Sequence, residues 1–279
     1  MIDLHMHTVC SDGKLTYEQI KDRIDKMGIQ KYAITDHNHA LAYDLFDYKS
    51  DEKLICGTEI TTSYNGVIIE VLLYNIEPKI INDWFYETYS QEKLIEIETL
   101  LFNDLYKIFI DLGYEFESNY KLRKIEKGYA KKQLYYDIVE RYPDFEYKTY
   151  KEFFRSALSN PKSPYYIDEG RTYPSLKEVK SLAKKAQGIA ILAHPYEYGI
   201  AIEDLESLVI EYQLDGMEAF HPSASTRQAI QILDFCEKNK LKSSMGSDFH
   251  KDERLVPLGV HVHKDIWKYT CLDWINKKE

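Results

Sequence analysis

The sequence contains no apolar run that approaches the ~20 residues of a membrane-spanning helix. Its first residues also lack the basic, apolar and small-residue pattern of a signal peptide, because the chain opens directly on a strand-like run. We therefore expect a cytoplasmic protein that does not act in a membrane.

Cysteine is scarce and widely spaced. The four cysteines are Cys10, Cys56, Cys236 and Cys271. Structural zinc sites use close Cys or Cys/His pairs, and disulfide frameworks belong to small secreted domains. We expect reduced thiols that take no part in either kind of framework.

Positive charge is not in excess. The formal net charge is −10, and a wholly acidic surface repels nucleic-acid phosphates. The charge therefore argues against binding duplex nucleic acid over a broad face. A small anion remains compatible, because the local charge of a bound metal ion outweighs the net charge.

What the sequence does contain is a series of short apolar runs that end in polar, ligand-type residues. Seven runs are candidate strands: 2–4, 32–34, 54–56, 67–74, 189–193, 217–220 and 242–245. Most are too uniformly apolar to be half exposed, which is typical of buried parallel strands.

Helical patterns separate several of these runs. The segments 16–27, 175–186 and 225–236 each open with Ser or Thr followed three residues later by Gln or Glu, which is a capping box. Alternating strands and helices predict βα units, with the chemistry at the C-terminal ends of the strands as in β/α barrels.

Residues 78–172 break this alternation. Apolar spacing between Ile95 and Phe109 indicates a long helix, and further helical stretches follow over 133–141 and 150–158. We expect a barrel domain of residues 1–77 and 173–279, with 78–172 as a helical insertion over the barrel mouth. A structural appendage is the alternative.

Histidines gather at both ends of the chain. His5 and His7 are two residues apart, so in a strand both imidazoles point to the same side and can reach one metal ion. Asp12 follows in a Ser-Asp-Gly turn. Asp248 and His250 repeat this spacing after the last run, which neighbours the first run in a closed barrel.

Other candidate ligands stand singly. His37 follows a run, with Asp36 expected to orient a neighbouring group, although a simple turn is the alternative. Glu59 lies just past a buried run, where an unpaired carboxylate costs several kcal/mol unless a cation is near. Glu70 inside its apolar strand is either a ligand or an outward residue of an edge strand. His194 is either a ligand or a satisfied core residue.

Together these motifs resemble the PHP family, the polymerase and histidinol phosphatase domain. The matching stretches are 3–8 (DLHMHT), 11–13 (SDG), 34–38 (ITDHN), 57–60 (GTEI), 192–195 (LAHP), 216–222 (GMEAFHP) and 246–250 (GSDFH). The resemblance implies an α/β fold, a distorted seven-stranded (β/α) barrel. It also implies two or three divalent ions, chosen among Mn²⁺, Zn²⁺, Fe²⁺ and Mg²⁺.

The family's ligand motifs carry over to eight residues, and we add Glu70, which stands where the similar subgroup usually has a histidine. The resemblance implies three ion positions: His5, His7, Glu59 and Asp248; Glu59, Glu70 and His194; Asp12, His37 and His250. These ions would hold a phosphate and lower the pKa of a bridging water.

The implied reaction is hydrolysis of a phosphomonoester by a metal-bridged hydroxide. The similar subgroup acts on nucleoside 3′,5′-bisphosphates or short oligonucleotides, so a small phosphorylated substrate is expected. Asp248 and His221 are the catalytic candidates, and His221 would contact the phosphate or protonate the leaving oxygen; a turn at Pro222 is the alternative. Arg171 and Arg227 are candidate anion contacts.

Three other functions stay open. A histidinol-phosphate phosphatase uses the same metal site. An amidohydrolase also uses His-x-His and a late Asp, but Glu59 then stands where a carboxylated Lys is common. A metal-binding module that recruits partners is the non-enzymatic alternative, and the near-complete ligand set argues against it.

Overall fold

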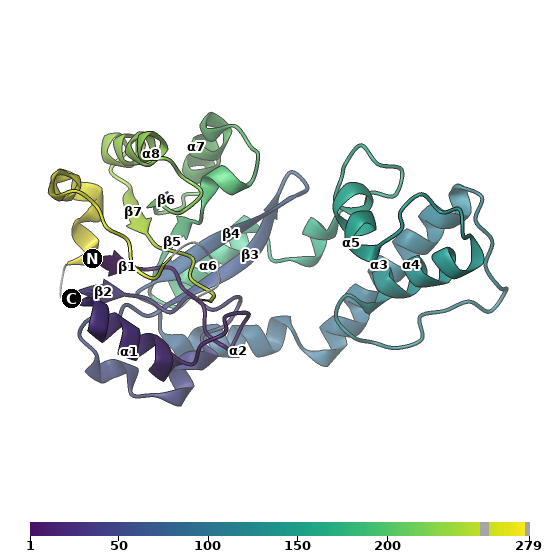
Figure 1. Cartoon of the computed structure of the whole chain (residues 1–279), viewed down its shortest axis with the longest axis horizontal. Helices are drawn as coiled ribbons and strands as arrows, with labels where there is room; N and C mark the ends of the chain where they lie inside the picture. Colours follow the sequence, from purple (N-terminus) through teal and green to yellow (C-terminus); the bar gives the residue numbers. More distant parts are fainter. Residues whose placement is uncertain (252–256, 277–279) are drawn as a thin grey trace. The chain divides into compact units, whose positions relative to one another are not determined.

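Figure 1 shows the computed structural model, which describes residues 1–251 and 257–276. The chain forms two compact units, one of Met1–Phe85 and Pro174–Glu279 and one of Tyr86–Tyr173. Each unit has a hydrophobic core of its own. Among the helices in these described ranges, none is both long enough and apolar enough to cross a membrane.

The first unit carries the strands. They are β1 (Ile2–Asp3), β2 (Lys31–Tyr32), β3 (Gly57–Tyr64), β4 (Val67–Tyr74), β5 (Ile189–Leu192), β6 (Gly216–Phe220) and β7 (Lys242–Met245). Strands β1 and β2 form a parallel pair, and the others form one sheet in the order β3-β4-β5-β6-β7. The fold is therefore mixed α/β.

The predicted parallel arrangement holds for only part of this sheet. Strands β5, β6 and β7 pair in parallel, whereas β4 is antiparallel to both β3 and β5. The reason is local: Asn65 and Gly66 have φ of 49° and 77°, which suits the tight turn of a β-hairpin.

The strand predicted over 54–56 is also misplaced. Strand β3 begins at Gly57, and Leu54 takes part only in an isolated bridge with Tyr32. Glu59 therefore lies inside a strand, not beyond the end of one.

Isolated bridges continue the pairing past the named strands. Met6 pairs in parallel with Phe249, and His37 pairs in parallel with Glu59. Gly246 packs so closely that a Cβ there would lie 2.1 Å from the Cβ of His5, which explains the glycine at this position. These contacts bring the segments that follow β1, β2 and β7 together beside β3.

Helices of the first unit pack along the sheet (Figure 1). They are α1 (Tyr17–Met27), α2 (Pro78–Thr88), α6 (Leu176–Lys185), α7 (Ile202–Glu211) and α8 (Thr226–Lys238). The three predicted capping boxes, which open α1, α6 and α8, are confirmed. Helix α8 packs on β6 and β7, and α6 packs on β3 and β5.

The second unit is helical. Its helices are α3 (Gln91–Asp111), α4 (Tyr129–Arg141) and α5 (Tyr150–Phe153), which continues as a π-helical turn over Phe154–Leu158. The three helical stretches predicted here are therefore confirmed. Aromatic side chains such as Phe109 and Phe153 fill the core of this unit.

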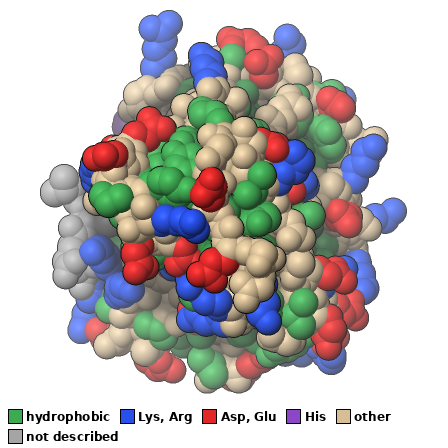
Figure 2. All heavy atoms as spheres, turned by 90° about the vertical axis from the view of Figure 1, so that its right-hand side faces the viewer, with side chains coloured by type: hydrophobic (Ala, Val, Ile, Leu, Met, Phe, Trp, Pro, Cys, Tyr) green, Lys and Arg blue, Asp and Glu red, His purple; other side chains and the backbone are tan. Residues whose placement is uncertain are grey.

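The face of the molecule seen in Figure 2 mixes acidic, basic and hydrophobic side chains and shows no continuous patch of charge of one sign.

Candidate metal centre

Glu59 lies at the centre of a buried group of histidines. Its Oε1 atom is 2.9 Å from Nε2 of His194 and 3.3 Å from Nε2 of His5. Its Oε2 atom is 3.3 Å from both Nε2 of His7 and Nδ1 of His37. Burial alone would raise the pKa of Glu59, but the histidines, His5 foremost, hold it well below its usual range.

The extended segment after β1 aims two of these histidines. The N–H of His7 donates to the carbonyl of Phe249 at 2.9 Å, which holds the backbone straight. As the spacing predicts, His5 and His7 point to the same side: their Nε2 atoms lie 3.5 and 3.2 Å from the same oxygen, Oδ1 of Asp248.

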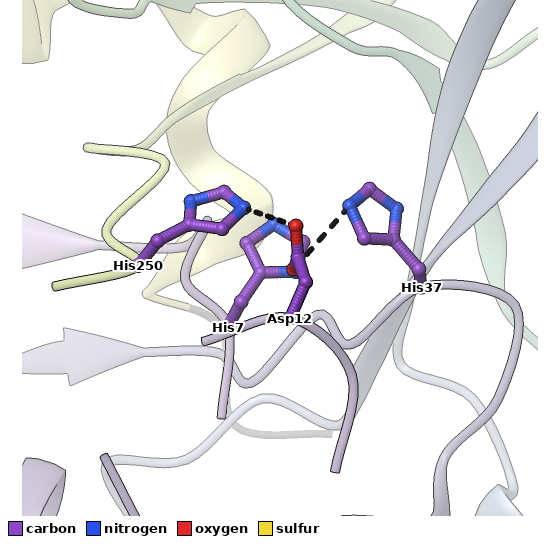
Figure 3. A group of neighbouring side chains, drawn as sticks. All are labelled: His7, Asp12, His37 and His250. Carbon is purple, nitrogen blue, oxygen red and sulfur yellow. Dashed lines mark ion pairs between the residues drawn. The ribbon is translucent and has the colours of Figure 1, made fainter. Parts of the chain in front are cut away.

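Asp12 gathers a second set of imidazoles (Figure 3). Its carboxylate lies 3.1 Å from Nε2 of His250, 3.7 Å from Nε2 of His37 and 3.8 Å from Nδ1 of His7. Asp12 is more than half exposed, at 56%, so this side of the cluster is open to solvent.

Asp36 shapes the turn that carries Asp12. It accepts hydrogen bonds from the backbone N–H of Thr8 at 2.7 Å, from the Thr8 hydroxyl at 2.7 Å and from the Ser11 hydroxyl at 2.6 Å. The group that Asp36 orients is therefore a loop. His39 contacts the same loop, with Nε2 at 3.0 Å from the carbonyl of Cys10.

Glu70 faces the cluster. Its Oε1 lies 3.4 Å from Nδ1 of His37, and its Oε2 lies 3.3 Å from Nε2 of His194. Strand β4 has β3 on one side and β5 on the other, so the edge-strand alternative is wrong. Whether Glu70 binds an ion stays a prediction.

These residues suit metal ions. Ligand atoms lie within 4.8 Å of one another in three overlapping groups: His7, Asp12, His37 and His250; His5, His7 and Glu59; His37, Glu59 and Glu70. Several of their buried nitrogens, including Nε2 of His5 and both nitrogens of His7, have no hydrogen-bond partner within the described part of the chain. An unpaired buried polar group costs ~1–3 kcal/mol, and a cation would satisfy several at once. Imidazole and carboxylate donors suit divalent ions.

The carboxylates and histidines of the cluster shift one another's pKa values. Burial would lower the histidine pKa values, but the carboxylates outweigh it: the pKa of His7 rises to about 9 and that of His194 to about 10. Conversely, burial would raise the pKa of Asp12, but the histidines, His250 foremost, lower it to about 2. The cluster thus holds excess negative charge that protonated histidines balance.

The three predicted substrate contacts differ in their surroundings. Nε2 of His221 lies 3.8 Å from Oδ2 of Asp248, at the edge of the cluster. Arg171 pairs with Asp104 inside the second unit. Arg227 is exposed in the first turn of α8. The roles of both arginines stay predictions.

Two buried carboxylates, which the sequence motifs did not single out as site residues, also form hydrogen bonds here. Glu218 in β6 accepts hydrogen bonds from the imidazole of His5 and the backbone of His194. Asp3 in β1 accepts hydrogen bonds from the backbone N–H and hydroxyl of Ser247 and from the N–H of Gly259. The sequence does contain a signal for both residues, because at each position an acidic residue interrupts an apolar run.

No family model matches the chain. A 5′-3′ exoribonuclease of Haemophilus influenzae is 26% identical to this chain, and the alignment covers 93% of each of the two chains. A phosphoribosyl 1,2-cyclic phosphate 1,2-diphosphodiesterase of Eggerthella lenta is 25% identical over 91% of this chain and 96% of its own. A crystal structure from Bifidobacterium adolescentis, of a protein proposed to be a metal-dependent phosphoesterase, aligns with a TM-score of 0.59 at 24% identity, over 99% of this chain and 98% of that one.

The relatives confirm the resemblance to phosphoesterases that the sequence motifs indicated. The two relatives are hydrolases of phosphoester bonds by name, and the solved structure supports the fold. One relative is an exoribonuclease by name, so the expectation that duplex nucleic acid is not a partner is not confirmed.

Proposed function

We propose that this chain is a metal-dependent hydrolase of phosphoester bonds. The observation that carries the proposal is Glu59, a buried carboxylate whose two oxygens each lie between two imidazoles at 2.9–3.3 Å. A carboxylate so placed suits a bridge between two cations. The phosphoester chemistry of the relatives agrees with this arrangement.

We assign two or three divalent ions to the cluster, with Mn²⁺, Zn²⁺, Fe²⁺ and Mg²⁺ as candidates. The first position takes His5, His7, Glu59 and Asp248; the second takes Glu59, Glu70 and His194; the third takes Asp12, His37 and His250. The overlapping ligand groups support part of this division, since they join His5, His7 and Glu59 and also Asp12, His37 and His250, but they group His37 with Glu59 and Glu70. The ion-pair contacts of Asp248 and His194 support their inclusion. Such ions, when bound, neutralise phosphoryl charge and make water a nucleophile at neutral pH.

His221 supplies a proton donor beside the cluster. The backbone N–H of Ser223 donates to Nδ1 of His221 at 3.1 Å, so the neutral ring carries its proton on Nε2. That nitrogen is buried and has no hydrogen-bond partner within the described residues. It faces Asp248, where the neutral ring would donate a hydrogen bond to a substrate oxygen and the imidazolium form would give a proton to the leaving oxygen.

We infer that the strands close into a distorted seven-stranded (β/α) barrel. The bridge between Met6 and Phe249 links the segments that follow β1 and β7, and the bridge between His37 and Glu59 links the segment that follows β2 to β3. We also propose that residues 78–172 form a helical insertion that covers the site. As contacts for a substrate anion we propose Arg171, which belongs to this insertion, and Arg227, which belongs to α8.

The substrate we propose is a small phosphorylated molecule or nucleotide, including a nucleoside 3′,5′-bisphosphate or a short oligonucleotide. The exoribonuclease and cyclic phosphodiesterase relatives support nucleotide-like substrates. The net charge of −10 argues against a long duplex, because the phosphates would be repelled outside the metal cluster. A cytoplasmic location stays a prediction.

The test is a substrate panel with protein loaded with Mn²⁺, Zn²⁺ or Fe²⁺. It contains a nucleoside 3′,5′-bisphosphate, a 5′-phosphorylated oligoribonucleotide, a cyclic nucleotide, histidinol phosphate and an amide substrate, with Glu59→Gln protein as the matched control. We expect phosphate or nucleotide release by the wild type alone. Preference for histidinol phosphate would select that phosphatase, amide cleavage alone would select the amidohydrolase, and metal binding without turnover would select the binding module.

A further inference from the structure

Glu218 lies behind the metal cluster, in the middle of β6. Its side chain has no exposed surface. Oε1 lies 3.1 Å from Nδ1 of His5, and Oε2 accepts the backbone N–H of His194 at 2.8 Å. One carboxylate thus holds two histidines that come from the two separate sequence segments of the first unit, residues 1–85 and 174–279.

The contact with His5 fixes which nitrogen of that ring carries a proton. A carboxylate only accepts hydrogen bonds, so Nδ1 of His5 is the donor. Nε2 lies on the other side of the ring, 3.3 Å from Oε1 of Glu59 and 3.5 Å from Oδ1 of Asp248. With the proton held on Nδ1, the lone pair of Nε2 is directed at the space between these two carboxylates, where a cation belongs.

The second contact of Glu218 fixes the backbone of His194, which carries another imidazole of the cluster. His194 lies two residues past the end of β5, and its Nε2 lies 2.9 Å from Oε1 of Glu59 and 3.3 Å from Oε2 of Glu70. The hydrogen bond from its N–H to Glu218 links the end of β5 to the neighbouring strand β6. The hydrogen bond therefore fixes the position of the His194 backbone, from which the imidazole reaches Glu59 and Glu70.

Stability does not explain a carboxylate here. Its neighbours in the strand, Met217 and Ala219, are fully buried, and a buried charge is costly compared with a well-packed apolar residue. In the described part of the chain, the hydrogen bonds of its carboxylate go to His5 and His194. What Glu218 contributes is the placement of these two residues.

We propose that Glu218 is a positioning residue for two ion positions at once, acting on the first through the imidazole of His5 and on the second through the backbone of His194. The proposal rests on the metal centre proposed above. The third position, where the carboxylate of Asp12 lies 3.1 Å from Nε2 of His250, serves as the comparison, because the hydrogen bonds of Glu218 in the described residues go to His5 and His194.

The test is metal binding by Glu218→Gln, measured by calorimetric titration of metal-free protein with Mn²⁺ and with Zn²⁺. Glutamine keeps the shape, but one acceptor oxygen becomes an NH₂ group that opposes either His5 Nδ1–H or His194 N–H. We expect affinity at two positions to fall ~10–100-fold, the usual cost of losing such a partner. Asp12→Asn should weaken only the remaining position, and Glu211→Gln, an exposed glutamate at the end of α7, should change none.

A second measurement does not depend on the variant. In wild-type protein loaded with Zn²⁺, ¹⁵N-edited NMR of the histidine rings should show His5 with its proton on Nδ1 and its metal on Nε2. Coordination through Nδ1, or wild-type affinities in folded Glu218→Gln protein, would overturn the proposal. Wild-type protein that binds ions but hydrolyses no phosphoester would contradict the proposed function and leave this inference intact. Wild-type protein that binds no ion would end both.

Discussion

Glu70 and His194 meet across the antiparallel strands β4 and β5, with 3.3 Å between Oε2 and Nε2. The other oxygen of Glu70 lies 3.4 Å from Nδ1 of His37. Together with Glu59, Glu70 makes this part of the cluster rich in oxygen. Oxygen ligands favour Mn²⁺ and Mg²⁺, whereas imidazole suits Zn²⁺ and Fe²⁺.

Glu70→His should therefore shift metal preference toward Zn²⁺ and Fe²⁺ while hydrolysis is kept. Metal-free protein would be titrated with each ion while phosphate release is followed, and Ile68→His, at an exposed position of the same strand, serves as the control. A metal profile identical to that of the wild type would show that Glu70 is not a ligand.

Asp248→Asn should abolish hydrolysis without unfolding the protein. Asp248 has a φ of 50°, which Asn tolerates better than Ala, so the backbone is preserved. We expect turnover to fall by at least ~100-fold, the upper end of the loss seen even for indirect metal partners. Circular dichroism would verify the fold, and a folded variant with wild-type turnover would refute the assignment.

The purified protein should carry two or more divalent ions per chain after reconstitution with Mn²⁺ or Zn²⁺. Glu59→Gln should lose most of them, because Glu59 faces four of the histidines. Elemental analysis measures both. Less than one equivalent on the wild type would contradict the metal centre.

Metal-free protein should lose stability as the pH rises from 7 to 10. The pKa of His7 is raised to about 9 and that of His194 to about 10. A histidine whose pKa is raised on folding stabilises the fold fully below its unfolded pKa of ~6.5, and this contribution is lost as the pH passes the folded value. Metal binding displaces the same protons, so apparent metal affinity should rise over this interval.

Thermal unfolding between pH 7 and pH 10 would test this, with and without metal. Because tyrosines and lysines also titrate near pH 10, the wild type is compared with His194→Asn in the same buffers. The two metal-free proteins should converge as the pH rises. A difference in melting temperature that does not change with pH would contradict the prediction.

Local sequence determined the features that depend on near neighbours. The capping boxes at Thr16, Ser175 and Ser225 place helix starts correctly, because their hydrogen bonds span only three residues. The pair His5 and His7 points one way because alternation in an extended chain needs no distant partner.

The tertiary structure decided what depends on distant partners. Glu218 and Asp3 looked like single acids in apolar strands, and only the folded chain joins Glu218 to His5 and Asp3 to Ser247. The hairpin turn at Asn65 and Gly66 that reverses the chain into β4 is local, but the pairing of β4 with β5 joins segments more than 100 residues apart, and no local pattern encodes it. Burying a charge is costly unless the charged group is paired and hydrogen-bonded. The sequence identifies the charged residue, but the partner lies far away in the sequence and becomes a neighbour only in the folded chain.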